Sequence, residues 1–213
     1  MHIELTEMLA CPEPHAADVL VLSTAQMKGR MVYFGLVGCP VCRNEYPIVN
    51  GVVEFGGRGT REEERGPAAT RPPSSATPPA SDAGTLQALL DLSGPGGFVV
   101  LVGEAVRHAA GLAGLMSGIH FVGVNAPAGL GESPVLSLVR APKGIPLRSA
   151  MARGVVVGAD LARAPWLEEA VRVLLRGRRL VIESESGVGA QHTAPPLVKP
   201  LASERGLWVG EKG

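Results

Sequence analysis

The sequence predicts an α/β protein with two folded parts: a small β module, followed by a larger domain built on a doubly wound parallel sheet. Near the N-terminus, a Cys-x-x-Cys motif stands among short segments that read as strands. Further along, continuous apolar runs, typical of strands buried on both faces, alternate with helix-like segments. A stretch rich in proline, glycine and serine separates the two. We therefore place the β module at 1–55, a linker at 56–83 and the larger domain at 84–213.

The overall composition limits the classes of function. The 213 residues carry 20 basic and 20 acidic side chains, so net charge gives no general attraction to nucleic acid or to an anionic membrane. The N-terminal residues lack a basic segment followed by an apolar run, and no apolar stretch is long enough to cross a membrane. The three cysteines favour metal ligation over a disulfide framework. We expect a cytoplasmic protein.

The first module carries a candidate zinc site. Cys39 and Cys42 lie three positions apart on a turn that contains Pro40, so both thiolates can reach one tetrahedral ion. Cys11 and His15 supply a second pair, and a predicted hairpin over 19–37 separates the pairs as in a zinc ribbon. A structural zinc would stabilise a unit of only about 55 residues.

Two other interpretations of these residues stay open. Cys11 and His15 can be a small buried residue and a loop residue, since the first pair lacks a second cysteine. A thioredoxin-like redox role for Cys39 and Cys42 is less favoured, because that motif opens a helix, and here Pro47 and Gly51 follow too soon.

Three segments of this module resemble the zinc-ribbon family of Trm-type methyltransferase activators. They are Thr6–Pro12, the Cys-Pro-Val-Cys motif at 39–42, and the Tyr-Pro-Ile-Val-Asn-Gly run that continues from Tyr46 to Phe55. This chain departs from the family where Pro14 and His15 replace the usual second cysteine of the first pair. The resemblance implies a ribbon that docks on a methyltransferase partner, either in cis or in trans.

The larger domain reads as repeated βαβ units. The sequence predicts strands over 98–103, 119–125, 135–139, 154–158 and 179–183, and helices over 85–92, 104–116 and 165–176. A final hairpin is predicted within 187–213. We expect the ligand crevice of such a Rossmann-like sheet at the carboxyl ends of its strands. The arginines around Arg172 and Arg179 are interpreted as the solvated end of a helix.

This domain resembles the class I S-adenosylmethionine-dependent methyltransferases. The resemblance is carried by 95–103 before and through the first strand, 145–157 through the fourth, and 167–182 through the last helix and fifth strand. It implies a cofactor site made by Gly103 and Glu104 after the first strand, Asn125 after the second and Asp160 after the fourth.

The same residues depart from the family's cofactor site. The first turn has one glycine where several are usual, so side chains would enter the space of the cofactor. Asn125 stands where the family has an acidic residue that binds the ribose hydroxyls. No motif for a methyl acceptor follows the fourth strand. The catalytic residues are unknown.

A competing placement of the cofactor loop uses 89–98, with Asp91, Gly94 and Gly96 as the binding residues. It requires one helix over 99–115, which the apolar run over 99–103 argues against.

The leading hypothesis is therefore a pseudo-methyltransferase or methyltransferase-associated adaptor with a structural zinc ribbon. An active S-adenosylmethionine-dependent methyltransferase with an atypical cofactor loop is the alternative, with Asp160 near the acceptor. A ribbon that binds RNA is a third hypothesis, which the neutral charge argues against.

Overall fold

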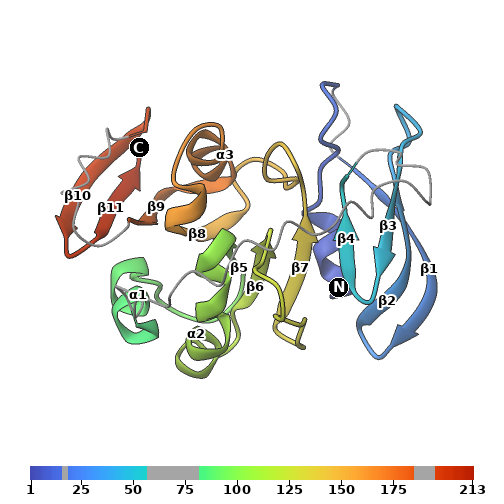
Figure 1. Cartoon of the computed structure of the whole chain (residues 1–213), viewed down its shortest axis with the longest axis horizontal. Helices are drawn as coiled ribbons and strands as arrows, with labels where there is room; N and C mark the ends of the chain where they lie inside the picture. Colours follow the sequence, from blue (N-terminus) through green and yellow to red (C-terminus); the bar gives the residue numbers. More distant parts are fainter. Residues whose placement is uncertain (16–18, 57–81, 185–194) are drawn as a thin grey trace.

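The structure is a computed structural model that describes residues 1–15, 19–56, 82–184 and 195–213. Most of the predicted linker, 57–81, lies outside the described residues. The described strands form one sheet of eleven in the order β1-β2-β3-β4-β7-β6-β5-β8-β9-β11-β10 (Figure 1). The strands are β1 (Val21–Lys28), β2 (Met31–Gly38), β3 (Glu45–Val49), β4 (Val52–Glu54), β5 (Phe98–Val102), β6 (His120–Val124), β7 (Leu136–Arg140), β8 (Ala152–Val157), β9 (Leu174–Glu183), β10 (Val198–Glu204) and β11 (Leu207–Lys212). The helices are η1 (Ile3–Glu7), α1 (Ala83–Leu90), η2 (Gly103–His108), α2 (Ala109–Leu115), η3 (Ala159–Leu161) and α3 (Trp166–Val173), where η marks a 3-10 helix.

The central strands confirm the predicted doubly wound sheet. Strands β7, β6, β5, β8 and β9 are parallel, and numbering them along the chain gives the order 3-2-1-4-5 of a Rossmann-like fold. The order reverses between β5 and β8, so the switch point lies at the carboxyl ends of these two strands. At one edge, the predicted C-terminal hairpin adds β11 and β10 in antiparallel pairing.

The ribbon, residues 1–55, extends the opposite edge of the sheet. Each of the strands β1 to β4 pairs antiparallel with the next, and the innermost of them, β4, pairs in parallel with β7. Val53 is in register with Val139, and Glu54 with Arg140, whose guanidinium donates to the Glu54 carboxylate at 3.0 Å. The ribbon and the central strands therefore share one hydrogen-bonded sheet. The domain boundaries stay a prediction.

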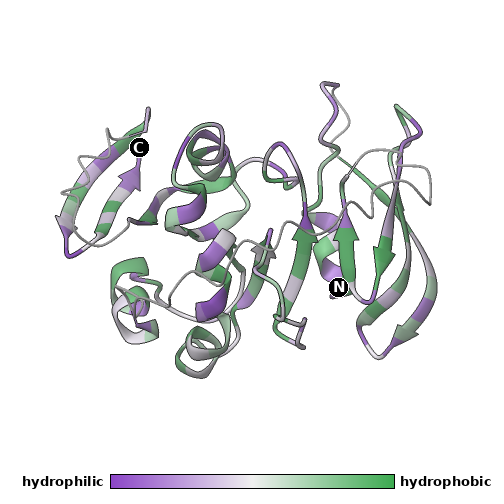
Figure 2. Cartoon of the chain, viewed as in Figure 1, coloured by the Kyte–Doolittle hydropathy of each residue, from purple (hydrophilic) through white to green (hydrophobic). Residues whose placement is uncertain are grey.

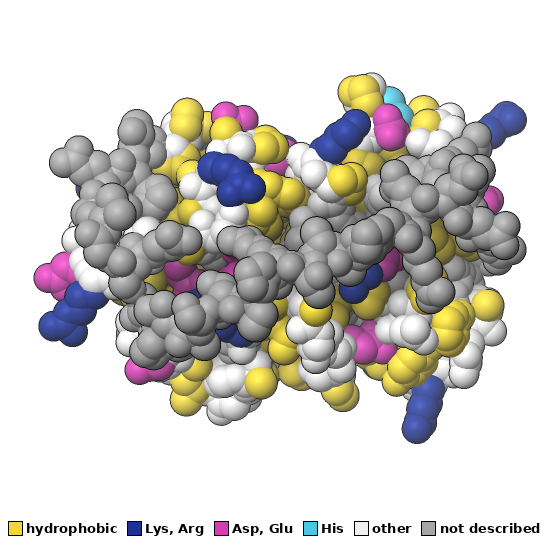
Figure 3. Space-filling view, in the orientation of Figure 1, with side chains coloured by type: hydrophobic (Ala, Val, Ile, Leu, Met, Phe, Trp, Pro, Cys, Tyr) yellow, Lys and Arg dark blue, Asp and Glu magenta, His cyan; other side chains and the backbone are white. Residues whose placement is uncertain are grey.

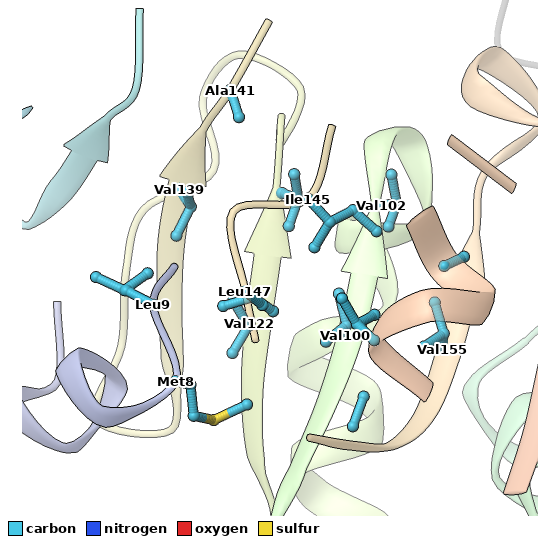
Figure 4. Close-up of a cluster of buried hydrophobic side chains, with 14 of the residues drawn as sticks. Met8, Leu9, Val100, Val102, Val122, Val139, Ala141, Ile145, Leu147 and Val155 are labelled. Atoms are coloured by element: carbon cyan, nitrogen blue, oxygen red, sulfur yellow. The ribbon is translucent and has the colours of Figure 1, made fainter. Parts of the chain in front are cut away.

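The alternation of side chains divides the core into two layers. Val100 and Val102 point to the face covered by α3 and the N-terminal segment, while Val99 and Leu101 point to the face covered by α1 and α2. The hydrophobic colouring of the central strands follows from burial on both faces (Figure 2). In the first layer, Met8 and Leu9 of the ribbon lie beside Leu147 and the β5–β6 side chains (Figure 4).

Several element ends differ from the predicted ones. Helix α1 begins at Ala83, two residues before the predicted start, because the Asp82 side chain caps it by accepting from the Thr85 amide at 2.7 Å. The helix predicted over 104–116 begins as the 3-10 helix η2 and becomes α-helical only at Ala109. Helix α3 ends at Val173, before Gly177, which lies in β9 at a shift of register where Ala152 pairs with Leu174 but Gly154 with Arg179. Gly177, with φ of 65°, therefore serves a bulge and does not end the helix.

The competing placement of the cofactor loop is wrong. Residues 98–102 form strand β5 instead of a helix, so the glycine-rich turn at 93–97 precedes a strand and lies at its amino end. The Arg153 guanidinium donates to the carbonyls of Ser93, Gly94, Pro95 and Gly96 and so holds this turn. Asp91 accepts from Arg179 at 2.6 Å.

The surface carries no strong charge pattern on the face shown in Figure 3. Basic and acidic side chains are spread singly over the visible described residues, with apolar side chains between them. Among the described helices, none is long and apolar enough to cross a membrane.

Candidate functional site

The structure brings the four predicted zinc ligands together. Their ligand atoms, from Cys11, His15, Cys39 and Cys42, all lie within 4.8 Å of one another. Cys11 and His15 come from the loop after η1, and Cys39 and Cys42 from the turn between β2 and β3. The β1–β2 hairpin separates the two pairs along the chain, as the spacing predicts.

The distances within this cluster fit a tetrahedral zinc ion. The Sγ atoms of Cys11 and Cys42 are 3.7 Å apart, and Cys39 Sγ is 3.4 Å from His15 Nε2. Zinc–sulfur bonds of about 2.3 Å and zinc–nitrogen bonds of about 2.05 Å at tetrahedral angles place two sulfurs about 3.8 Å apart, and sulfur and nitrogen about 3.6 Å apart. A disulfide needs a sulfur separation of about 2.05 Å, and all three cysteines are free.

Local hydrogen bonds shape the turn that holds Cys39 and Cys42. The Cys39 amide donates to the Asn44 carbonyl at 2.9 Å, and the Arg43 amide donates to the Cys39 carbonyl at 2.9 Å. Arg43 adopts a φ of 60°, which closes the turn. Burial opposes ionisation of Cys39, but hydrogen bonds from the backbone of Cys42 and Val41 bring its pKa below the ordinary value. That thiol is therefore the one prepared as a thiolate ligand.

Cys11 lies in less polar surroundings than Cys39. Burial raises the pKa of the Cys11 thiol to about 11. Its Sγ lies 3.3 Å from the Tyr46 hydroxyl, whose pKa burial also raises. The Tyr46 ring packs against Phe55 with centroids 4.6 Å apart. A bound cation would offset the cost of ionising Cys11 in these surroundings.

The residues predicted to bind the cofactor lie at the carboxyl edge of the sheet, but each is engaged by the protein itself. Gly103 and Glu104 follow β5, and Asp160 follows β8. The Asp160 carboxylate accepts from the Glu104 amide at 3.0 Å. A Cβ on Gly103 would lie 2.5 Å from the same carboxylate. The Gly158 amide donates to the Val102 carbonyl at 2.9 Å, which joins the ends of the two strands.

Asn125 is engaged in the same way. Its side-chain amide donates to the Ala141 carbonyl at 2.8 Å and accepts from the Ala141 amide at 2.9 Å. Both ends of the Asn125 amide therefore tie the end of β6 to the end of β7. A ribose hydroxyl could hydrogen-bond to this side chain only in competition with the backbone.

Helix η2 lies over the switch point between β5 and β8. Gly103, Ala105, Val106 and His108 of this helix are buried. Arg107 donates to Glu183 at 3.1 Å, and His108 Nε2 lies 2.9 Å from the other Glu183 oxygen, which fastens η2 to the end of β9. Helix η2 thus covers the switch point, and the residues predicted to bind the cofactor there are bonded to the chain's own groups.

A cleft of about 700 Å³ lies elsewhere, between the ribbon and the central sheet. One side is formed by 10–14 and 44–46 of the ribbon, and the other by 141–146 after β7 together with Glu169 and Arg172 of α3. The metal ligand Cys11 lines it, whereas Gly103, Glu104, Asn125 and Asp160 do not. This size suits a small ligand or a short peptide.

Arg172 lines this cleft, and its side chain, predicted to be solvated, is 34% exposed but also bonded to the chain. The guanidinium donates to the carbonyls of Ile145 and Leu147, both at 2.7 Å, and pairs with Glu169 at 2.7 Å. Glu169 also accepts from the Ile145 amide at 3.1 Å. In the sequence, the Glu-x-x-Arg spacing indicates only a pair on one helix face; the carbonyl partners lie 25 and 27 residues away and have no sequence signal.

Comparisons with known proteins leave the family open. No protein-family model matches the sequence, and no curated protein is significantly similar to it. Among solved structures, a geranyl diphosphate C-methyltransferase from Streptomyces coelicolor is 16% identical with a TM-score of 0.42, and the match covers 48% of this chain and 44% of that one. A chain from the complex of the Haloferax volcanii Trm112 methyltransferase activator and a putative methyltransferase is 22% identical with a TM-score of 0.39. The match covers 48% of this chain and 50% of that one. A putative S-adenosylmethionine-dependent methyltransferase from Methanococcus maripaludis is 12% identical with a TM-score of 0.44. The match covers 61% of this chain and 83% of that one.

These similarities are too distant to carry an argument about function. The matched part spans half or less of the Streptomyces and Haloferax chains. The assignment of this chain to a Rossmann-like α/β fold with an N-terminal β module therefore stands on its own strand order and registers.

Proposed function

We propose that this protein is a noncatalytic, methyltransferase-like adaptor, in which a zinc-stabilised ribbon is docked in cis on a Rossmann-like sheet. Zinc would be held by Cys11, His15, Cys39 and Cys42 and would have a structural role. Four protein ligands complete a tetrahedral shell, so no position is left for a water or substrate molecule.

The hydrogen bonds that engage the predicted cofactor residues with the chain itself support the noncatalytic part of this proposal. Binding of S-adenosylmethionine needs backbone that approaches the cofactor and polar groups that are free to receive it. Here the Asp160 carboxylate caps η2, and both ends of the Asn125 amide are bonded to Ala141. Opening the crevice would break these bonds and those of the Arg107–Glu183 pair, which is a cost that cofactor contacts would first have to offset.

The β4–β7 pairing supports the part of the proposal in which the ribbon docks in cis. Because the ribbon already covers the edge of the central sheet, this edge is not free for a partner. A methyltransferase partner in trans would therefore use another surface of this protein, or would have to displace the ribbon.

Isothermal titration with S-adenosylmethionine tests the proposal. We expect no heat of binding at cofactor concentrations up to the millimolar range. A dissociation constant in the micromolar range would overturn the noncatalytic function and favour the alternative of a working methyltransferase. In that case Asn125→Ala and Gly103→Val would abolish transfer of a labelled methyl group.

A further inference from the structure

We infer that metal binding at the Cys11, His15, Cys39 and Cys42 cluster is thermodynamically linked to the junction between the ribbon and helix α3. The junction is defined as 8–10 of the ribbon, 145–148 of the loop between β7 and β8, and Glu169 and Arg172 of α3. The inference rests on the proposed zinc site and is independent of whether the protein binds S-adenosylmethionine.

The first part of the link joins the metal cluster to the loop. Directly before Cys11, the Ala10 amide donates to the Pro146 carbonyl at 3.0 Å, and the Arg148 amide donates to the Met8 carbonyl at 2.7 Å. Leu9 and Leu147 face each other as an antiparallel bridge, and both side chains are completely buried (Figure 4). The segment that ends at the candidate ligand Cys11 is therefore paired with the loop through an isolated antiparallel bridge.

The second part joins the loop to α3. Arg172 donates to the carbonyls of Ile145 and Leu147, on either side of Pro146, which accepts from Ala10. Glu169 accepts from the Ile145 amide. Two sets of hydrogen bonds, joined by the backbone of 145–147, thus connect Ala10, beside Cys11, to the guanidinium of Arg172.

A bound metal ion would join Cys11 to the turn that carries Cys39 and Cys42. Cys39 and Cys42 lie on the turn between β2 and β3, and that hairpin is anchored to the sheet through β4 and β7. A shared ion fixes Cys11 to this anchored turn and so holds 8–10 against the loop. Ala10 and Cys11 line one wall of the cleft, so metal occupancy would also hold that wall in position.

Linkage is reciprocal, so a change that weakens the junction must weaken metal binding. Arg172 touches the loop but not the cluster, which makes Arg172→Met the test and Arg179→Met the matched control. Arg179 likewise donates to a backbone carbonyl, that of Leu89, and pairs with a carboxylate, that of Asp91. These contacts lie at the opposite part of the sheet, away from the ribbon.

The measurement is the zinc affinity of the full chain by competition with a chromophoric chelator. We expect Arg172→Met to weaken zinc binding about fivefold or more, and Arg179→Met to bind like wild type. Equal affinity in Arg172→Met and wild type, with both folded by circular dichroism, would overturn the linkage. If the methionine variant fails to fold, Arg172→Lys with Arg179→Lys repeats the comparison, because lysine keeps the charge but loses the planar fork that reaches two carbonyls.

Hydrogen exchange gives the same test from the metal side. Zinc removal by a chelator should speed exchange of the Ala10 and Arg148 amides at least tenfold more than exchange of the Val100 and Val122 amides, which reports the global stability of the central strands. Unchanged exchange at Ala10 and Arg148 after verified zinc loss would refute the linkage while leaving the zinc site intact. A wild-type protein that takes up no zinc would instead overturn the zinc site and the linkage together.

Discussion

Gly158 shows at the scale of one residue how closely the chain packs at the switch point. A Cβ at this position would lie 2.8 Å from the Ala105 amide nitrogen and 2.9 Å from that of Glu104. Both are backbone atoms, so they cannot turn aside as a flexible side chain can. The φ of −68° is ordinary for any residue, so the crowding alone would act on a substitution.

Gly158→Ala should therefore lower the free energy of unfolding by about 1 to 3 kcal/mol. Gly38→Ala in β2 is the control, because its added Cβ would meet only the Val21 carbonyl oxygen at 3.9 Å. Urea denaturation of both variants checks this. Equal stability of the two would show that η2 and η3 are farther apart than described.

The zinc ligands give a second prediction at this scale. Cys42→Ser should lose stoichiometric zinc and lower the free energy of unfolding by several kcal/mol, since ligand loss removes folding energy that the metal supplies. Val41→Ser, at an exposed position of the same turn, should keep zinc and change stability by less than about 0.5 kcal/mol. Metal analysis and thermal denaturation make the comparison. Full zinc content in Cys42→Ser would remove Cys42 from the ligand set.

The positions of single residues can be predicted where their spacing in the sequence restricts how far apart they can lie in space. Cys39 and Cys42 must lie close in space because only two residues separate them, and a hairpin can bring Cys11 and His15 beside them. The partners of Arg172 could not be predicted in this way. They are backbone carbonyls of a loop distant in the sequence, and a carbonyl is present in every residue type. Asn125 was placed correctly at the end of β6, but its bonds to Ala141 also involve backbone groups.

At the scale of elements, the start of β6 carries a partly buried histidine, His120, against the N-terminal segment. The His120 ring lies 4.9 Å from that of His2 and 5.5 Å from that of Phe98, and its Nε2 is 3.1 Å from the Ser137 hydroxyl. Burial lowers the pKa of His120 to about 4, and His2 and the N-terminal ammonium lower it too, while Glu4 acts in the opposite direction.

Acid should therefore destabilise the protein through His120. An unfolded chain takes up this proton near pH 6.5, whereas the folded chain does so only near pH 4. The free energy of unfolding should fall by about 3 kcal/mol as the pH falls through these two values, and this contribution should level off once the pH is well below 4. In His120→Asn, urea denaturation at pH 7 and pH 4.5 should show a smaller difference between the two pH values than in wild type. An identical difference would exclude His120 as the cause.

The types of the elements were more predictable than their ends. Continuous apolar runs identified β5, β6, β7 and β8, because strands buried on both faces have no polar side. The end of α3 was misplaced because Gly177 resembles a helix terminator, whereas the pairing of β9 with β8 starts already at Leu174. Tertiary pairing decided this boundary, and a local signal cannot report it.

At the scale of the whole molecule, the ribbon and the central strands share a sheet and a core. Met8 and Leu9 of the ribbon belong to the same buried cluster as Val100 and Val122. We therefore expect one cooperative thermal transition in calorimetry, and a chelator should shift the whole transition to lower temperature. Two separate transitions, with only the first sensitive to the chelator, would show that the ribbon folds and docks independently.

The sequence could predict two modules but not their junction. Composition separates 1–55 from 84–213, yet the pairing of β4 with β7 joins residues 86 positions apart and involves only three residues of each strand. Backbone pairing of this kind leaves almost no pattern in a single sequence. For the proposed closed switch point, the sequence offers one signal, the lack of further glycines after Gly103, which predicts side chains in the space of the cofactor.

The most direct test of the central claim is an amide NMR titration of the full chain with S-adenosylmethionine. The proposed closed crevice predicts that the signals of Gly103, Glu104 and Asn125 keep their positions up to millimolar cofactor. Saturable shifts of these three signals with a midpoint in the micromolar range would contradict it, because they would place the cofactor at the switch point that the chain is proposed to keep closed.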